Sequence, residues 1–288
     1  MRIKIVPDDK TQETLRPVSP ASRNTKRLQI RHMLLLLGAR FFLLILLLVV
    51  WQFSSTHIDP IFLSSPLAIW QQTMAWISDG SLWFHTAITL QEALLGLIFG
   101  VIAGILVGFL FGMAPWLAEL LDPLVIGLYS IPKVALAPLF ILWFGIDIQM
   151  KIIFTAITVF FLVFLNTHAG VRNVDPDLIN AVLLMGGKRR AILLKVIVPS
   201  SIGHILTGLR TAIPYALIGA VIAELIASNR GLGYLIENAA TEFNTAGVFS
   251  ALLVLTMIAF LLNAIVSIID RNTSRWKATM KSERKQVS

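Results

Sequence analysis

The chain has 288 residues, of which 56% are hydrophobic and 14% are charged, whereas a typical soluble domain carries roughly 25% charged residues. The apolar residues come in runs of about twenty, the length of helix that crosses a ~30 Å hydrocarbon core, and this excludes a soluble globular class. The absence of cysteine excludes a disulfide framework, Cys-ligated zinc, an iron–sulfur cluster and a thiol nucleophile.

The formal net charge of +8 does not indicate a nucleic-acid-binding protein. The basic residues lie in the two tails and one internal loop, without the aromatic residues of a base-stacking groove. This distribution is typical of the positive-inside rule for membrane proteins.

Residues 1–33 form a basic cytoplasmic tail with eight Lys or Arg, and we expect it to be disordered or loosely held on anionic headgroups. The apolar run from Met33 to Phe53 is too long for the core of a signal peptide, and no small-residue cleavage site follows it. It is therefore predicted to be an uncleaved first span, with Arg40 either snorkelling or facing other helices.

Six spans fit the hydropathy pattern best, and they define an all-α membrane protein. The transmembrane domain is expected to cover 34–270, with a basic cytoplasmic tail at 271–288. The predicted spans are about 34–54, 86–112, 117–143, 151–169, 203–227 and 247–269.

The orientation follows from the basic residues that flank these spans. The N-terminal tail has eight, the 170–202 loop has five and the C-terminal tail has six, and with six spans all nineteen fall on one side. Five or seven spans would scatter the basic loops onto both sides. Both termini are therefore predicted to be cytoplasmic.

The 55–85 segment on the opposite side carries apolar residues at helical spacing after Pro66, and three tryptophans suited to the headgroup level. An amphipathic helix on the membrane surface and an ordinary packed loop helix both fit this pattern.

Glycine recurs at every fourth position of the second span, and we interpret this ridge as a helix-packing surface. Small residues let membrane helices approach closely, although a pore-lining surface would have the same composition. The ridge consists of Gly96, Gly100, Gly104, Gly108 and Gly112.

The third span is interrupted by Pro123, Pro132 and Pro138. Each proline removes a backbone donor, and the stretch around Ser130 and Lys133 is the most irregular. A broken helix that lines the transport pathway is one interpretation; a packed kink with Lys133 in an ion pair is the other. Pro214 in the fifth span is a weaker case of the same kind.

Two carboxylates lie within predicted spans, Glu92 near an end of its span and Glu224 near the outer end of another. Structural ion pairing and a role in transport or gating both remain open. The cations available as partners are Lys133, Lys151 and Arg210.

The loop at 172–200 is predicted to fold as two short helices. Asp175 is suited to cap a helix that starts at Pro176, with Asp177 at the positive end of its dipole. Gly186 and Gly187 supply a left-handed stop. A second helix is expected from Lys188 to Val198, ended by Pro199.

The same loop resembles the Glu-Ala-Ala…Gly…Ile-x-Leu-Pro motif of ATP-binding-cassette importer permeases, in the spacing of Asn180, Ala181, Gly186 and Pro199. Asn180 replaces the motif's glutamate, so any salt bridge made by that glutamate is absent here. Further stretches resemble the nitrate, sulfonate and taurine branch: YSIPKVALAPLFILWFGI (129–146), NTHAGVRNVDPDL (166–178), LTGLRTAIPYALIGAVIAEL (206–225) and GLGYLI (231–236).

The resemblance implies the fold of type I importer permeases and a bacterial inner-membrane location. It implies that two copies form a pathway for a small anion such as a sulfonate, taurine or nitrate, delivered by an extracytoplasmic binding protein. It implies that cytoplasmic ATPase subunits dock on the loop, through Asp177, Asn180, Ala181, Gly186, Gly187, Lys188, Arg189, Arg190 and Pro199. The pathway and gating residues that we expect are Ser130, Pro132, Lys133, Pro138, Pro214 and Glu224.

No phosphate loop is present, because Gly187-Lys188 is followed by Arg189 instead of Ser or Thr. The chain is therefore expected to be no enzyme and to hold no cofactor or metal, with ATP and Mg²⁺ bound by the partner subunit. An ion-coupled secondary transporter is the alternative, but the sequence shows no internal repeat with matching midplane carboxylates. A membrane enzyme would need clustered His, Asp or Glu at one face.

Overall fold

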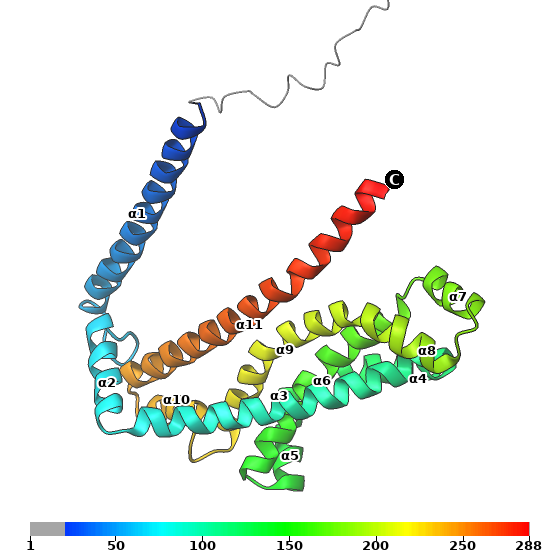
Figure 1. The fold of residues 1–288 in the computed structure, drawn as a ribbon. Helices are drawn as coiled ribbons and strands as arrows, with labels where there is room; N and C mark the ends of the chain where they lie inside the picture. The colour runs from blue at the N-terminus through cyan, green and yellow to red at the C-terminus, as the bar shows by residue number, and fades with distance from the viewer. Residues whose placement is uncertain (1–20, 288) are drawn as a thin grey trace, which may run out of the picture. The chain divides into compact units, whose positions relative to one another are not determined.

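The computed structural model describes residues 21–287, and in this part of the chain every regular element is a helix (Figure 1). The α-helices are α1 (Ala21–Ser55), α2 (Pro66–Ser78), α3 (Ser81–Met113), α4 (Pro115–Ser130), α5 (Ala137–Phe144), α6 (Ile148–Arg172), α7 (Pro176–Leu184), α8 (Arg189–Ile192), α9 (Val198–Ile226), α10 (Leu232–Thr241) and α11 (Thr245–Val287). A 3₁₀ turn, η3 (Lys133–Leu136), precedes α5, and a π turn, η4 (Leu193–Ile197), joins α8 to α9.

The chain divides into two compact units between Asp59 and Pro60. The first contains α1, whose apolar side chains from Met33 to Phe53 are mostly exposed, as expected of a helix surrounded by lipid. Helix α1 begins within the predicted tail, at Ala21, and includes residues 21–33. No glycine or proline lies between Ala21 and Leu37, so the helix of the span extends backwards without a break. Residues 1–20 lie outside the described residues.

The centre of the second unit is the contact between α3 and α6. A Cβ atom on each ridge glycine would lie 2.5–2.9 Å from an atom of α6, so only glycine allows this approach. The pairs are Gly96 with Thr155, Gly100 with Val159, Gly104 with Val163, Gly108 with Thr167, and Gly112 with Val171. Both residue numbers rise together along this contact, and the two helices therefore run parallel.

Helices α6 and α9 run antiparallel, because Gly170 contacts His204 at one end of the contact and Gly219 contacts Thr155 at the other. Three neighbouring helices, α3, α6 and α9, thus form the packed layer of this unit (Figure 1). Their close approach leaves Val159, Val163 and Ala212 with almost no exposed surface.

The third predicted span is a pair of helices, α4 and η3–α5, bent by 83° at the break between them. Proline at position 132 disfavours helical geometry at the residue before it, and Ile131 is extended, with φ −67° and ψ 128°. Pro123 lies inside α4 without ending it, and Pro138 occupies the first turn of α5, where its missing N–H is tolerated. Only one of the three prolines therefore breaks the span.

This bent pair counts as one crossing of the membrane. Since α3 and α6 are parallel, the chain between them has to return to the side from which α3 starts. The predicted six spans are confirmed: five continuous apolar helices within residues 21–287, and the bent pair as the sixth.

One boundary prediction is wrong. The helix predicted to end at Pro199 continues into the fifth span, so that Arg189–Ile226 is one helical stretch. The Val198 N–H donates to the Leu193 carbonyl across the π turn, and Pro199 falls in the first turn of α9. Pro199 therefore lies inside a helix that is already under way, and it removes one N–H donor without ending the helix, directly after the wider π turn.

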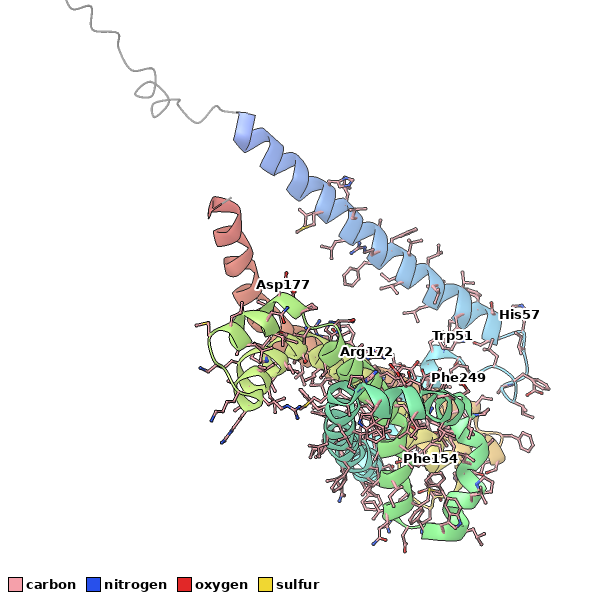
Figure 2. All side chains as sticks on the ribbon, turned by 90° about the vertical axis from the view of Figure 1, so that its right-hand side faces the viewer. Trp51, His57, Phe154, Arg172, Asp177 and Phe249 are labelled. Atoms are coloured by element: carbon pink, nitrogen blue, oxygen red, sulfur yellow. The ribbon has the colours of Figure 1, made fainter. Side chains whose placement is uncertain are left out.

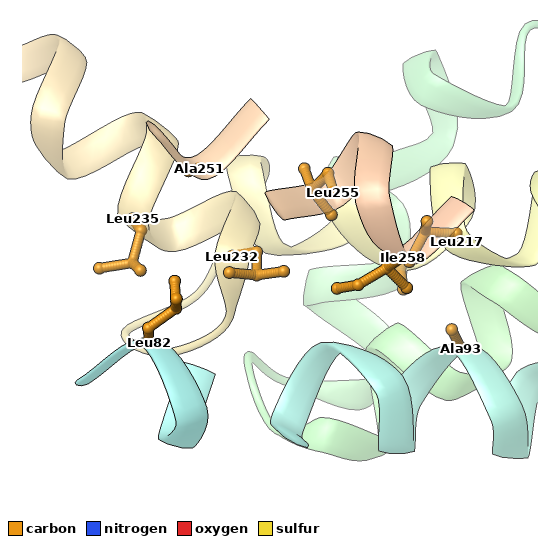
Figure 3. Close-up of a cluster of buried hydrophobic side chains, with 9 residues drawn as sticks. Leu82, Ala93, Leu217, Leu232, Leu235, Ala251, Leu255 and Ile258 are labelled. Carbon is orange, nitrogen blue, oxygen red and sulfur yellow. The ribbon is translucent and has the colours of Figure 1, made fainter. Parts of the chain in front are cut away.

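Helices α2, α10 and α11 pack beside one end of the layer. Figure 3 shows Leu82 of α3 near Leu232 and Leu235 of α10, within one buried apolar cluster. α2 joins this unit through buried Ile69, whose carbonyl accepts a hydrogen bond of 3.0 Å from the Ser250 hydroxyl of α11. The 55–85 segment therefore contains a packed helix, although Trp70 on its other face is exposed.

Candidate functional site

The segment between α6 and α9 forms a compact elbow, which we define as α7, the turn at 185–188 and α8. The Asp175 carboxylate accepts the Asp177 N–H at 2.9 Å, and Pro176 takes the first helical position, in agreement with the predicted helix start. Gly186 has φ +77°, a left-handed conformation that ends α7 and that other residues rarely adopt.

The elbow exposes both charged and apolar side chains. Leu184 and Met185 are 90% and 86% exposed, beside the basic start of α8. They are the two most exposed large apolar side chains of the elbow. The sequence motif did not identify these two residues; apolar residues next to a glycine stop were the available signal.

The residues predicted for docking are brought together here. Gly187 packs against Val182, and all the others are exposed on or next to the elbow. The exposed residues are Asp177, Asn180, Ala181, Gly186, Lys188, Arg189, Arg190 and Pro199. Figure 2 shows Asp177 at the elbow and Phe154 among the bundled helices.

A second feature is a cavity of about 410 Å³ beside the break between α4 and α5. Three of the predicted pathway residues line it: Ser130, Pro132 and Lys133. Pro138, Pro214 and Glu224 are not in its lining. The opposite wall comes from α6 and α9, with Thr158 and Tyr215.

Lys133 faces this cavity and makes no ion pair with any described carboxylate. Its ammonium lies 5.0 Å from the centre of the Tyr129 ring and 5.2 Å from that of Phe161. These are cation–π distances, which compensate part of the cost of removing the charge from water. The interpretation of Lys133 as part of a structural ion pair is therefore wrong for the described residues.

The third feature is a buried ion cluster of Glu92, Lys151 and Glu224, on α3, α6 and α9. The Lys151 ammonium lies 3.2 Å from the Glu92 carboxylate, and both side chains are almost completely buried. Lys151 also donates to the Ser228 hydroxyl at 2.6 Å. Although Glu92 lies near an end of its predicted span, the tight α3–α6 contact encloses it completely.

Glu224 holds the start of α10. Its carboxylate accepts the Thr89 hydroxyl at 2.7 Å and the Gly233 N–H at 2.6 Å. A carboxylate on the free N–H groups of a helix start is favoured by the helix dipole. A Cβ atom at Gly231, where φ is +108°, would overlap this carboxylate.

Two further side chains of α3 fix the same loop. The His85 Nδ1 accepts the Gly231 N–H at 2.9 Å, and the Thr89 hydroxyl oxygen accepts the Leu232 N–H at 2.8 Å. Sequence reasoning missed Thr89, His85 and Ser228, since single polar residues carry no partner information. The glycine pattern of GLGYLI was the one visible signal that the backbone approaches another group here.

Within residues 21–287 no group of three His, Asp or Glu side chains converges as a metal site. Six crossings, a bent span beside a cavity and a protruding elbow together define a multi-pass α-helical membrane transport protein.

The chain belongs to the family of binding-protein-dependent transport system inner membrane components, whose family model matches residues 96–277. It is 39% identical over 238 residues to the riboflavin transport system permease protein RibX of Chloroflexus aurantiacus, covering 82% of this chain and 89% of that protein. It is 35% identical over 244 residues to the putative aliphatic sulfonates transport permease protein SsuC of Escherichia coli, covering 84% and 93%.

The fold matches that of a solved structure, the MetNI methionine ABC transporter in inward-facing form, with a TM-score of 0.59 and 19% identity. The match covers 69% of this chain and 97% of that chain. The predicted resemblance to importer permeases, including the sulfonate branch, is confirmed, and the protein is a multi-pass permease subunit of the inner membrane.

Proposed function

We propose that the chain forms half of a dimeric import pathway and that cytoplasmic ATPase subunits dock on the elbow. The observation that carries this proposal is the elbow itself, a capped helix with a left-handed glycine stop, two bare apolar residues and a basic flank. The ATP and Mg²⁺ belong to the ATPase subunit, and an extracytoplasmic binding protein delivers the solute. The second permease is a further copy of this chain.

The crossings support a cytoplasmic position for the elbow and both termini. One crossing, α9, separates the elbow from the α9–α10 loop, and α11 then returns to the side of the elbow. With α1 as the first crossing, the N-terminus lies on that side too. Nineteen Lys and Arg residues fall there, which is the distribution that favours the cytoplasm.

We infer that the solute is a small organic or inorganic anion such as a sulfonate, taurine or nitrate. The support is the sulfonate permease among the relatives and a cavity with an unpaired lysine. The printed name of RibX refers to riboflavin, so the family tolerates different solutes on one fold.

Gly186→Val is expected to abolish docking while leaving membrane insertion intact. A β-branched residue is strained at φ +77°, and relieving that strain unwinds the end of α7 that presents Leu184 and Met185. Copurification of the ATPase subunit from native membranes, with uptake driven by the binding protein, is the measurement. We expect both to fall at least ~10-fold, as for the loss of one well-packed interface anchor.

Gly80→Val is the matched control. Gly80 also has a left-handed φ, +80°, and an open surrounding, but it lies at the start of α3 on the other side of the membrane. The same strain there should leave ATPase recovery unchanged. Equal recovery with both variants would contradict docking at the elbow, and uptake that persists after ATP depletion would favour an ion-coupled transporter instead.

A further inference from the structure

We propose that the cavity beside Lys133 is a binding site for the anionic group of the transported solute, with the Lys133 ammonium as its charged contact. This inference deepens the proposed import function and rests on it. It assigns a solute-contacting residue within the membrane subunit, in addition to the separate protein that delivers the solute.

The cavity lies within the membrane-spanning layer. Its walls come from three crossings: residues 129–134 at the break, Phe154, Thr158 and Leu162 of α6, and 215–222 of α9. Phe161, which contacts Lys133, is near the middle of α6, so the ammonium lies about half way across this helix. A volume of about 410 Å³ falls within the usual range for small-molecule sites.

Lys133 and Lys151, both on predicted spans, differ in what surrounds their ammonium groups. The Lys151 ammonium forms an ion pair with the Glu92 carboxylate and donates a hydrogen bond to the Ser228 hydroxyl, and its side chain is almost completely buried. Among the described residues, the Lys133 ammonium contacts only the two aromatic rings of Tyr129 and Phe161. The Lys133 side chain also lines the cavity. A cation at membrane depth normally faces a counter-charge or a water-filled path, so this cavity is complementary to an anion.

The other polar groups of the cavity fit the same ligand. Ser130 and Thr158 already donate their hydroxyl protons to backbone carbonyls of their own helices, at 2.7 and 3.0 Å. The phenol groups of Tyr129 and Tyr215 have no hydrogen-bond partner among the described residues and are each more than 40% exposed. Two free O–H donors and an ammonium make a site that favours an acceptor-rich anionic group such as a sulfonate.

The bend between α4 and α5 is what creates this arrangement. The extended Ile131 and Pro132 interrupt the helix, which turns Lys133 out of the α4 axis and leaves space beside α6 and α9. A straight helix through the same residues would fill that space with its own next turn. The cavity is therefore a product of the break, and the charged residue lies at the break itself.

The test is equilibrium dialysis of radiolabelled ethanesulfonate against the full chain in lipid nanodiscs. We expect saturable binding to the unsubstituted chain, weakened roughly 10-fold or more by Lys133→Gln and less than about 3-fold by Lys133→Arg, since a charge-assisted contact is lost only in the first. Tyr215→Phe should weaken binding by a few-fold. Ethanesulfonamide, nearly equal in shape but uncharged, should not compete.

The inference is overturned by absence of saturable ethanesulfonate binding to the unsubstituted chain, or by equal competition from the uncharged sulfonamide. Unchanged affinity in Lys133→Gln would likewise remove Lys133 from the site. Tyr215 lies on α9, away from the break between α4 and α5. Weaker binding in Tyr215→Phe therefore reports the loss of a contact and not a disturbance of the break.

The same preparations distinguish this inference from the import function. Copurification of the ATPase subunit depends on the elbow, which Lys133 does not contact. An ATPase that binds normally together with absent ethanesulfonate binding refutes the anion site alone. Ethanesulfonate binding that requires Lys133, in a chain that recovers no ATPase subunit, refutes the importer and keeps the site.

Discussion

Lys151→Met is expected to destabilise the membrane-spanning unit by about 3–5 kcal/mol, the usual cost of leaving a buried charge without its partner. Lys151 and Glu92 are both almost fully enclosed between α3 and α6, with 3.2 Å between ammonium and carboxylate. Removing the ammonium leaves the Glu92 carboxylate in an apolar contact and takes away the donor to Ser228. The measurement is the midpoint of SDS-induced unfolding in mixed micelles.

The double substitution Lys151→Met with Glu92→Leu should recover most of this loss, because it removes both charges together. Lys188→Met is the control for loss of a lysine, since Lys188 is exposed on the elbow and should have little effect. Equal midpoints for Lys151→Met and Lys188→Met would show that the ion cluster does not stabilise the fold.

Gly100→Ala should separate α3 from α6 and lower the free energy of unfolding by about 1–3 kcal/mol, through overpacking of a tight contact. The added Cβ would lie 2.5 Å from the Ala156 carbonyl oxygen and 2.7 Å from the Val159 Cβ. The Ala156 oxygen is a backbone atom and the Val159 Cβ is attached directly to the backbone, so the two helices have to move apart. The apparent melting temperature in mild detergent measures this effect.

Gly127→Ala in α4 is the matched control, because nothing lies within 4 Å of its Cβ position. Alanine favours helix over glycine by about 1 kcal/mol, so this variant should be neutral or slightly more stable. Alanine at Gly96 and at Gly112, with the same 2.5 Å approach, should behave as at Gly100. A stabilising effect of Gly100→Ala would contradict close packing along the ridge.

Several features follow from local sequence alone, because they depend on neighbours in the chain. The apolar runs gave the six crossings, since span length is set by the thickness of the bilayer. Asp175, Pro176 and Gly186 marked the ends of α7, because helix caps involve residues only a few positions apart. The stretch around Pro132 marked the break for the same reason.

Other features were decided only by tertiary packing. The glycine ridge predicted a closely packed neighbouring helix. Only the packed structure shows that this helix is α6 and that α3 and α6 run parallel. Two helix boundaries, the π turn before Pro199 and the start of α1, were also not predicted. They depend on how a helix continues across a boundary, which residue propensity describes poorly.

The partner of each buried lysine is decided by long-range packing. Lys151 pairs with Glu92 while Lys133 faces a cavity, although both are lysines within apolar sequence. Charge pairing in a membrane depends on distance in space, and three helices far apart in the chain have to meet before that distance exists.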